Sequence, residues 1–478
     1  MLPTFAKIRA VWTSVATESM RSDTLIDKSE FGMTDSSADA KFSLTSSSTV
    51  VIANMIGTGV FTSLGFQLLE IQSGFVILML WAVGGVVALC GALSYAELGA
   101  AMPRSGGEYN FLTRIYHPGA GFISGWVSST IGFAAPTALV ALTSGAYLTS
   151  ALPFLPESAS TWVAGFLVVS LAAVHASHRN NSAFIQNSFT LAKIALIAIF
   201  CVAGVLMTQA PQGMHFMPAQ GDGTLMLSGA FAVSLIYVTY AYTGWNAVTY
   251  ISGEVENPQR TIPLALVAGT MVVALLYVGL NFTFLHTAPV SALQGEIEIG
   301  YVSALHIFGQ AGAALIGVTL SFLLISTVSA MTLAGPRVLQ MIGEDFAVFR
   351  PLAVTNEHDV PSRAIWLQAG ISLLFIFTNS FESILVFAGF TLGLNTLFTV
   401  LGVFILRRKE PELPRPYRVS LYPLPPLVYL AITGWSLGFI LLERPMEGLA
   451  GIGIVVTGGV FYFLSRDRVG ATITESAD

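Results

Sequence analysis

The stretch ANMIGTGVFTS, residues 53–63, lies inside an apolar run that is long enough to cross a bilayer. It contains Gly57, Thr58 and Gly59, which hold a helix less well than alanine or leucine. Because lipid offers no hydrogen bonds, unwound backbone at this depth survives only where it faces protein or a polar cavity. The stretch therefore predicts a helix that is interrupted within the membrane, beside an internal site.

Close helix packing is the alternative explanation for the two glycines of this stretch. Gly57 and Gly59 are two residues apart, so they lie about 200° from each other around a helix and do not share one packing face. This geometry favours the interruption.

The composition indicates an all-α integral membrane protein. The chain has 478 residues, of which 54% are hydrophobic and 10% are charged, whereas soluble domains carry about 25% charged residues. Apolar runs near the length of a membrane helix occur twelve times. They lie near residues 43–69, 75–101, 120–152, 161–174, 183–207, 225–252, 261–286, 310–333, 364–379, 383–405, 422–442 and 447–464.

The distribution of basic residues supports this count. With the N-terminus inside, nearly all of the 21 Lys and Arg residues fall in inner loops and tails; only Arg444 lies in an outer loop and Lys193 within a span. We therefore expect a multi-pass protein of the cell membrane with cytoplasmic tails at residues 1–42 and 465–478. The first tail contains an apolar stripe over residues 5–15 that suits either a short helix on the membrane surface or a disordered segment.

A second interruption is predicted in the sixth run, where YAYTGWNAV, residues 240–248, is polar and contains glycine at mid-depth. Five spans separate the two interruptions, so the second unit enters the membrane from the opposite side. This is the layout of an inverted repeat. We expect a first repeat at residues 43–210, a second repeat at 225–406, and two added helices at 422–464.

Two interrupted helices predict a site for a molecule with both signs of charge. If the first helix breaks near Gly57, its outer half begins there, and the free N–H groups and positive dipole end favour a carboxylate. The outer half of the sixth span ends near Tyr240 and Ala241, where free carbonyls suit an ammonium group. These groups fit the zwitterionic head of an α-amino acid.

Neutral amino acids are the expected substrates, because no Asp or Glu lies at mid-depth in any span. The faces of Tyr240, Tyr242 and Trp245 could still hold a cation. None of the seven histidines lies in mid-span, and His175 is expected in an inner loop. No enzyme activity, cofactor, metal site or nucleic-acid partner is expected; the partners are the substrate and the lipid bilayer.

Lys193 lies about 15 Å into its span when counted from Ala183 at about 1.5 Å per residue. A lysine at this depth faces the bundle interior and is a functional candidate. Its ammonium could replace a sodium ion beside the first interruption, or it could gain and lose a proton in each cycle. A structural lysine held by backbone carbonyls is the remaining possibility.

Four motifs resemble those of the amino acid–polyamine–organocation superfamily over residues 43–464, and Gly-Trp-Asn at 244–246 points to its L-amino-acid transporter branch. The motifs are IGTGVF (56–61), SYAELGAAMPRSGGEYNFL (94–112), GWNAVTYISGEVENPQRTIP (244–263) and LRRKEPELPRPYRV (406–419). The resemblance implies the LeuT-like fold: twelve transmembrane helices in a 5+5 inverted repeat with discontinuous helices 1 and 6, plus helices 11 and 12.

The resemblance also implies roles for individual residues. It places Lys193 at the coupling position of sodium-independent members, and Tyr240 and Trp245 at a gate over the substrate. The residues expected to bind the substrate are Met55, Ile56, Gly57, Thr58, Gly59, Tyr240, Ala241, Tyr242, Thr243 and Gly244.

The expected function is sodium-independent secondary transport of neutral L-amino acids by alternating access, as an exchanger. Proton-coupled symport and a sensor built on a transporter fold remain alternatives. Animal members that pair with a heavy chain carry a cysteine between the third and fourth helices, and residues 152–160 have none. No disulfide-linked heavy chain is therefore expected. Thr243, where members with large substrates tend to have glycine, favours small side chains.

Overall fold

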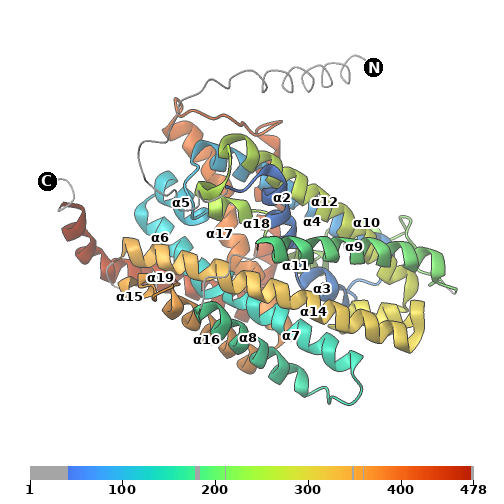
Figure 1. Ribbon diagram of the computed structural model, residues 1–478. Coiled ribbons are helices and arrows are strands. Elements are labelled where there is room, and N and C mark those ends of the chain that lie inside the picture. Colours follow the sequence, from blue (N-terminus) through green and yellow to red (C-terminus); the bar gives the residue numbers. More distant parts are fainter. Residues whose placement is uncertain (1–40, 178–182, 210, 347–348, 359, 475–478) are drawn as a thin grey trace, which may run out of the picture. The chain divides into compact units, whose positions relative to one another are not determined.

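The computed structural model describes residues 41–177, 183–209, 211–346, 349–358 and 360–474 (Figure 1). The chain divides into two units, Met1–Lys41 and Phe42–Asp478, and the account below concerns the second. The apolar stripe at residues 5–15 and most of the predicted N-terminal tail lie outside the described residues. Within the described part of the chain, β-pairing is limited to an isolated parallel bridge between Phe42 and Val255.

The second unit is helical, and the helices carry the labels of Figure 1. In chain order they are α2 (Leu44–Met55), α3 (Gly59–Gln67), α4 (Gly74–Ala101), α5 (Glu108–Ile115), α6 (Pro118–Val127), η1 (Ser128–Gly132), α7 (Ala134–Ala151), α8 (Ala159–Ser177), α9 (Ala183–Met207), α10 (Asp222–Leu225), α11 (Gly229–Ala241), η2 (Ala247–Glu254), α12 (Pro258–Thr287), α13 (Val290–Leu293), α14 (Ile299–Asp345), α15 (Arg350–Ala353), α16 (Ser362–Thr378), α17 (Phe381–Lys409), α18 (Leu424–Glu443) and α19 (Pro445–Thr474).

Among the described residues, ten helical segments are long and apolar enough to cross a membrane, and two shorter apolar helices, α11 and α16, join them. The segments combine α2 with α3, and α6 with η1 and α7. Apolar composition of this extent, repeated over so many helices, marks the chain as a multi-pass membrane protein.

Two predicted boundaries are wrong. The run predicted at 310–333 belongs to the longer α14, which bends at Gly309 (φ 69°); residues 299–308 were missed because Ser303 and His306 interrupt their apolar pattern. The sixth run begins at Gly229, where the Ser228 hydroxyl accepts from the N–H of Phe231. The span predicted at 447–464 agrees with the membrane-spanning segment Pro445–Ser465, although helix α19 continues to Thr474.

One further expectation is corrected. His175 lies in α8 rather than in a loop, it is 6% exposed, and its Nε2 is 2.8 Å from the Ser329 hydroxyl on α14. The partner on a neighbouring helix explains how a histidine is accommodated at this buried position.

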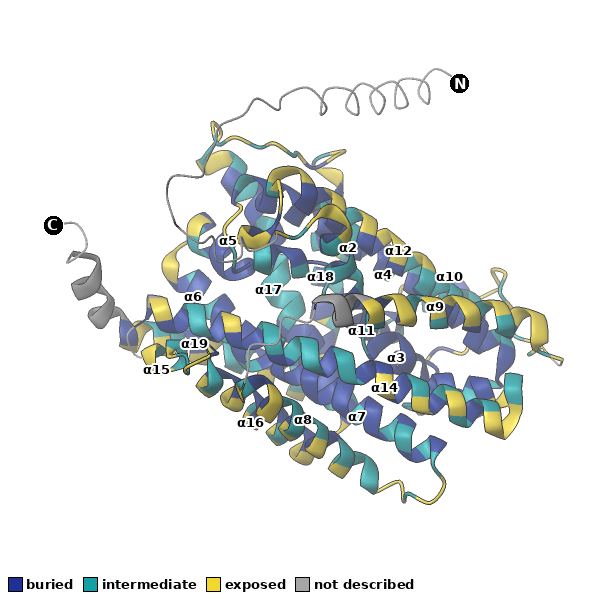
Figure 2. Ribbon diagram, viewed as in Figure 1, coloured by how far each residue is buried: buried dark blue, intermediate teal, exposed yellow. Residues whose placement is uncertain are grey.

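Burial separates inner from outer helices (Figure 2). Most of the apolar window of Leu44–Gln67 and of Pro118–Ala151 is buried, whereas Pro445–Ser465 and Ser188–Met207 bury little of theirs. The outer helices expose large apolar side chains, such as Leu206 on α9 and Phe463 on α19. Exposed apolar surface of this kind suits contact with lipid, so the interrupted helix α2–α3 lies in the interior of the bundle.

Candidate functional site

The first interruption lies between α2 and α3. Helix α2 ends at Met55, the C-cap Ile56 has ψ 77°, and α3 begins at Gly59. Within the described residues, the N–H groups of Thr58, Gly59 and Val60 make no backbone hydrogen bond. Free N–H groups at a helix N-terminus, together with the helix dipole, favour an anionic ligand.

The second interruption lies between α11 and η2, where residues 242–246 form turns. Gly244 has φ 99°, a conformation that glycine adopts without strain. The carbonyl of Tyr240 accepts from the backbone N–H of Thr243 at 2.9 Å and from the Thr243 hydroxyl at 2.6 Å. These bonds close the end of α11 and stabilise the turn.

The two interruptions are in direct contact. A β-carbon added at Gly59 would lie 2.5 Å from both Cα and Cβ of Ala241, and one added at Gly244 would lie 2.6 Å from the carbonyl oxygen of Asn54. The packing explanation is therefore also valid for Gly59. It does not hold for Gly57, whose β-carbon would meet only atoms 3.9 Å or more away.

Tyr277 on α12 connects both interruptions and was not predicted from the sequence. Its hydroxyl lies 2.5 Å from the carbonyl oxygen of Met55 and 3.2 Å from that of Ala241. A hydroxyl carries one proton, so it donates to one carbonyl at a time and leaves the other able to accept elsewhere. A tyrosine in the middle of an apolar span was the signal that could have indicated this role.

Lys193 reaches the first interruption from α9. Its Nζ donates to the carbonyl of Ile56 at 3.4 Å and to the hydroxyl of Thr327, on α14, at 2.5 Å; the residue is 5% exposed. Among the described residues, no carboxylate lies within ion-pair distance of this ammonium. The structure thus brings a cationic side chain to the carbonyl end of α2, where the helix dipole is negative.

Thr58 is held by the third span. Its hydroxyl bonds to the hydroxyl of Thr143 on α7, and Thr143 donates onward to the carbonyl of Leu139 at 2.8 Å. Since the Thr143 proton is used in that second bond, Thr58 is the donor to Thr143. In this arrangement the Thr58 hydroxyl is free only to accept, and the backbone N–H groups remain the donors of the interruption.

A cavity of about 40 Å³ lies beside the second interruption. It brings together four of the predicted site residues, Tyr240, Tyr242, Thr243 and Trp245, but none of residues 55–59. Its walls also include residues that the sequence did not single out, from α4, α17 and α18. The lining is Gly84, Val87, Ala88, Ile236, Thr239, Tyr240, Tyr242, Thr243, Trp245, Gly389, Leu392, Gly393, Thr396, Tyr429, Thr433 and Ser436.

The aromatic residues of the cavity differ in how they are held. The hydroxyl of Tyr242 donates to the carbonyl of Trp81 at 3.1 Å, and the Trp245 ring packs edge-on against Tyr95 with centroids 4.6 Å apart. Tyr240 is 4% exposed, and its hydroxyl makes no hydrogen bond among the described residues. Tyr240 therefore has a polar end still available within the cavity.

Metal ligands do not gather here. Among the residues that the structure describes, no group of three or more His, Cys, Asp or Glu side chains could hold a metal ion. The site offers backbone dipoles, hydroxyl groups and one ammonium.

Comparison with known proteins places this geometry in context. The model of the family described as "Amino acid permease" matches residues 42–463. The chain is 28% identical over 438 residues to the large neutral amino acids transporter small subunit 2 of Rattus norvegicus, covering 88% of this chain and 80% of that protein.

Two further relatives have similar coverage. The chain is 25% identical to the b(0,+)-type amino acid transporter 1 of Mus musculus over 422 residues. The match covers 87% of this chain and 85% of that protein. The chain is 27% identical to the serine/threonine exchanger SteT of Bacillus subtilis over 428 residues. The match covers 88% of this chain and 95% of that protein.

Proposed function

Because the chain belongs to the amino acid permease family, we propose that it is a sodium-independent secondary transporter of neutral L-amino acids that works by alternating access as an exchanger. The family and its relatives are transporters, not enzymes. The observation that carries the proposal is the contact between Gly59 and Ala241, which joins the N-terminus of one half-helix to the C-terminus of another.

The proposed architecture has twelve spans arranged as an inverted repeat, with residues 43–210 and 225–406 as the two repeats and 422–464 as the added pair. The interruption between α2 and α3 and the interruption between α11 and η2 support it. Helices broken at corresponding places in two halves are typical of transporters with a site near the membrane midplane. The excess of Lys and Arg on one side supports cytoplasmic tails at both ends.

The substrate headgroup binds between the two interruptions. Its carboxylate accepts from the free N–H groups at Thr58 and Gly59, at the positive end of α3. Its ammonium donates to the carbonyls of Ala241 and Thr243, at the end of α11; the Tyr240 carbonyl, also expected to bind it, joins them once the Thr243 hydroxyl releases it. Tyr277 leaves either the Met55 or the Ala241 carbonyl able to accept. Ile56, Gly57, Tyr242 and Gly244 complete the site by shaping its backbone.

A small, neutral side chain fits the cavity beside this headgroup. A volume of about 40 Å³ corresponds to roughly three water-sized positions, and no charged residue lines it. The Thr243 side chain occupies part of the same space. Among the relatives, one is named for large neutral amino acids and one for serine and threonine. For this chain, the size of the cavity favours substrates as small as serine and threonine.

Lys193 supplies the positive charge that a sodium ion would provide at the first interruption, since its Nζ donates to the carbonyl of Ile56. This arrangement supports sodium independence. Tyr240 and Trp245, which line the cavity, act as the gate over the substrate. A disulfide-linked heavy chain is not part of the proposal, because the two cysteines, Cys90 and Cys201, lie within membrane-spanning helices.

Proteoliposomes test the proposal. They are loaded with or without unlabelled amino acids, and uptake of a labelled panel is measured with and without a pH gradient and with sodium replaced by choline. We expect uptake of small neutral amino acids that requires internal amino acid and is unaffected by removing sodium. Uptake into empty vesicles driven by the pH gradient would instead identify proton symport. Binding without counterflow would identify a sensor.

A further inference from the structure

Glu108 is a buried carboxylate outside the proposed substrate site. It is the first residue of α5, in the connection between the segments Gly74–Ala101 and Pro118–Ala151, and it is 1% exposed. The two preceding residues, Gly106 and Gly107, have φ 112° and 52°, which turns the chain sharply before the helix. This turn carries the carboxylate into the interior of the protein.

Three side chains donate to Glu108. Its Oε1 accepts from the Tyr95 hydroxyl on α4 at 2.9 Å and from Nδ2 of Asn246 at 2.5 Å, and its Oε2 accepts from the hydroxyl of Tyr250. Asn246 is the N-cap residue of η2, at the end of the second interruption, and Tyr250 lies within η2. The carboxylate therefore joins the second half of the sixth span to α4.

Backbone contacts join the same two segments. The N–H groups of Gly106 and Gly107 donate to the carbonyls of Tyr250 and Thr249, at 3.3 and 3.2 Å. The N–H of Gly253 donates to the Ser105 hydroxyl at 2.9 Å. Residues 105–108 and η2 thus form one connected unit, which we call the latch.

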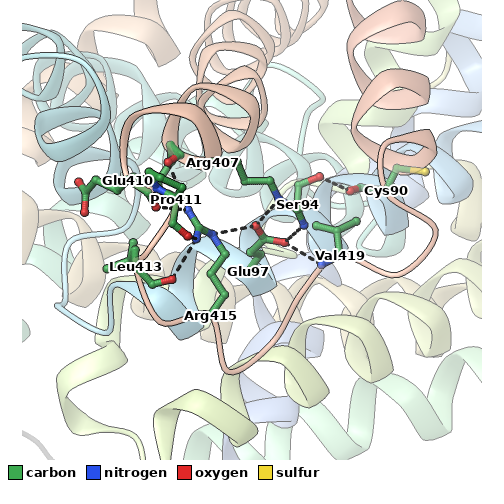
Figure 3. Close-up of polar contacts among 10 residues, drawn as sticks. Cys90, Ser94, Glu97, Arg407, Glu410, Pro411, Leu413, Arg415 and Val419 are labelled. Atoms are coloured by element: carbon green, nitrogen blue, oxygen red, sulfur yellow. Dashed lines mark hydrogen bonds and ion pairs between the residues drawn. The ribbon is translucent and has the colours of Figure 1, made fainter.

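No cation neutralises Glu108 within the described part of the chain. The contrast is Glu97 on α4, whose carboxylate binds Arg407 through two bonds of 2.8 and 2.6 Å, lies 3.6 Å from Nε of Arg415, and accepts from the N–H of Val419 (Figure 3). Glu97 is thus held as a paired anion. Glu108 has neutral donors alone, so its charge depends on those donors remaining in place.

The titratable groups that face Glu108 are tyrosines: Tyr95 on α4, Tyr250 in η2 and Tyr429 on α18. Of the charged side chains on neighbouring elements, Arg407 of α17 is bound to Glu97, and Glu254 of η2 is bound to Arg337 of α14. At the start of α6, His117 accepts from the N–H of Gly119 through Nδ1.

Burial raises the pKa of the Glu108 carboxyl above its ordinary value, and the hydrogen bonds from Tyr250, its own backbone N–H, Tyr95 and Asn246 act in the opposite direction. A movement of η2 away from α5 removes the bonds from Tyr250 and Asn246, which lower the pKa, and leaves those from Tyr95 and the backbone N–H. The released state then binds a proton more tightly than the latched state does.

We propose that Glu108 is a proton-binding site, and that its ionised form holds the cytoplasmic half of the sixth span closed. Hydrogen bonds to a carboxylate are roughly twice as strong as those between neutral groups. A protonated carboxyl also carries a hydrogen of its own and accepts fewer bonds. Proton uptake therefore weakens the latch and favours release of η2. The inference rests on the proposed alternating-access function, in which this half-helix moves.

Cysteine accessibility tests the latch without requiring transport. Ser252 of η2 is fully buried, and in a Cys90→Ala, Cys201→Ala background a Ser252→Cys substitution reports its exposure. The maleimide labelling rate of the purified protein is measured from pH 5 to pH 8. It is divided by the rate of an exposed Glu412→Cys reporter, because thiol reactivity itself depends on pH.

The expected rate ratio rises at least fivefold as the pH falls. In Glu108→Gln the ratio is high and independent of pH. Glu410→Gln, which changes an exposed carboxylate paired with Arg114 of the same helix α5, behaves as the parent. Tyr250→Phe keeps the carboxylate but removes a donor that lowers its pKa, so the transition moves to higher pH.

A ratio that is flat in the parent, or a titration that persists in Glu108→Gln, overturns the inference. If Glu108→Gln fails to fold, a transition in Tyr250→Phe that does not move to higher pH overturns it equally. The assay contains no substrate, so its outcome is separate from that of the proteoliposome experiment. A latch that titrates in a protein without exchange activity contradicts the proposed function alone.

Discussion

Gly59 and Ala241 touch through their backbones: a β-carbon at position 59 would lie 2.5 Å from Cα of Ala241. The contact joins a helix N-terminus to a helix C-terminus at the level where both helices are interrupted. The free N–H donors at the start of α3 therefore lie close to the Ala241 carbonyl, which shares the Tyr277 hydroxyl with Met55. This is the feature of the fold that suits an amino acid headgroup, and the first predictions concern its surroundings.

Lys193→Met removes the ammonium that bonds to Ile56 and Thr327 while keeping a long side chain. A hydrogen bond from a charged donor contributes about 1.5–3 kcal/mol, so we expect the initial rate of exchange to fall at least tenfold. Lys409→Met is the matched control, because Lys409 also donates to a backbone carbonyl, that of Ile115, away from the site. A Lys193→Met protein with the parent rate and pH profile would remove this residue from the mechanism.

Tyr277→Phe removes the hydroxyl shared by the carbonyls of Met55 and Ala241. The loss of one hydrogen bond of about 1 kcal/mol predicts a rise in KM of roughly fivefold, with a smaller change in maximal rate. Tyr116→Phe is the control, since Tyr116 donates to the carbonyl of Phe398 outside the site. An unchanged KM in Tyr277→Phe, with both proteins folded, contradicts the proposed role.

Thr243→Gly enlarges the cavity beside α11, where the threonine side chain forms part of the wall. We expect bulky neutral amino acids to compete for uptake at least fivefold better relative to small ones. Thr243→Ser, which keeps the hydroxyl bonded to the Tyr240 carbonyl, should change this ratio less. Competition by a panel of unlabelled amino acids provides the measurement. A Thr243→Gly protein that gains nothing for bulky competitors shows that this residue does not limit substrate size.

Glu97→Gln leaves Arg407 and Arg415 without their carboxylate, and the Arg415 side chain is only 6% exposed. Removing one partner of a buried ion pair costs about 3–5 kcal/mol. We therefore expect a large fall in the thermal unfolding temperature of the purified protein. Glu410→Gln breaks the exposed pair with Arg114, where the cost is about 1 kcal/mol or less. Equal unfolding temperatures for the two variants would show that the buried cluster contributes little to stability.

The membrane spans and the two interruptions could be predicted from the sequence because they follow from local composition. Long apolar runs locate helices, and Gly57 and Gly244 mark places where helices are weak. The approach of Lys193 to the first interruption was predicted, but other contacts between distant segments were not. Tyr277 reads locally as an apolar residue of α12, and only the tertiary fold shows that its hydroxyl meets the carbonyls of two other helices.

The cavity could not be predicted from the local sequence pattern either. Gly389 and Gly393 of α17 read as ordinary glycines of a membrane helix, and their role as cavity walls depends on how α17 lies beside α11. Glu108 lies within the motif of residues 94–112, but local pattern does not indicate its role, because its three donors come from α4, from the N-cap of η2 and from η2 itself. Neighbours brought together by folding decide what such residues do.

Equilibrium binding of labelled serine to the purified protein, with and without Gly59→Ala, tests most directly whether the headgroup binds where Gly59 meets Ala241. Gly370→Ala is the matched control, since a β-carbon at position 370 has no neighbour within 4 Å. With unfolding temperatures recorded for all three proteins, the account predicts saturable binding to the parent and to Gly370→Ala, and at least tenfold weaker binding to Gly59→Ala. A folded Gly59→Ala protein that binds serine with the parent affinity contradicts it.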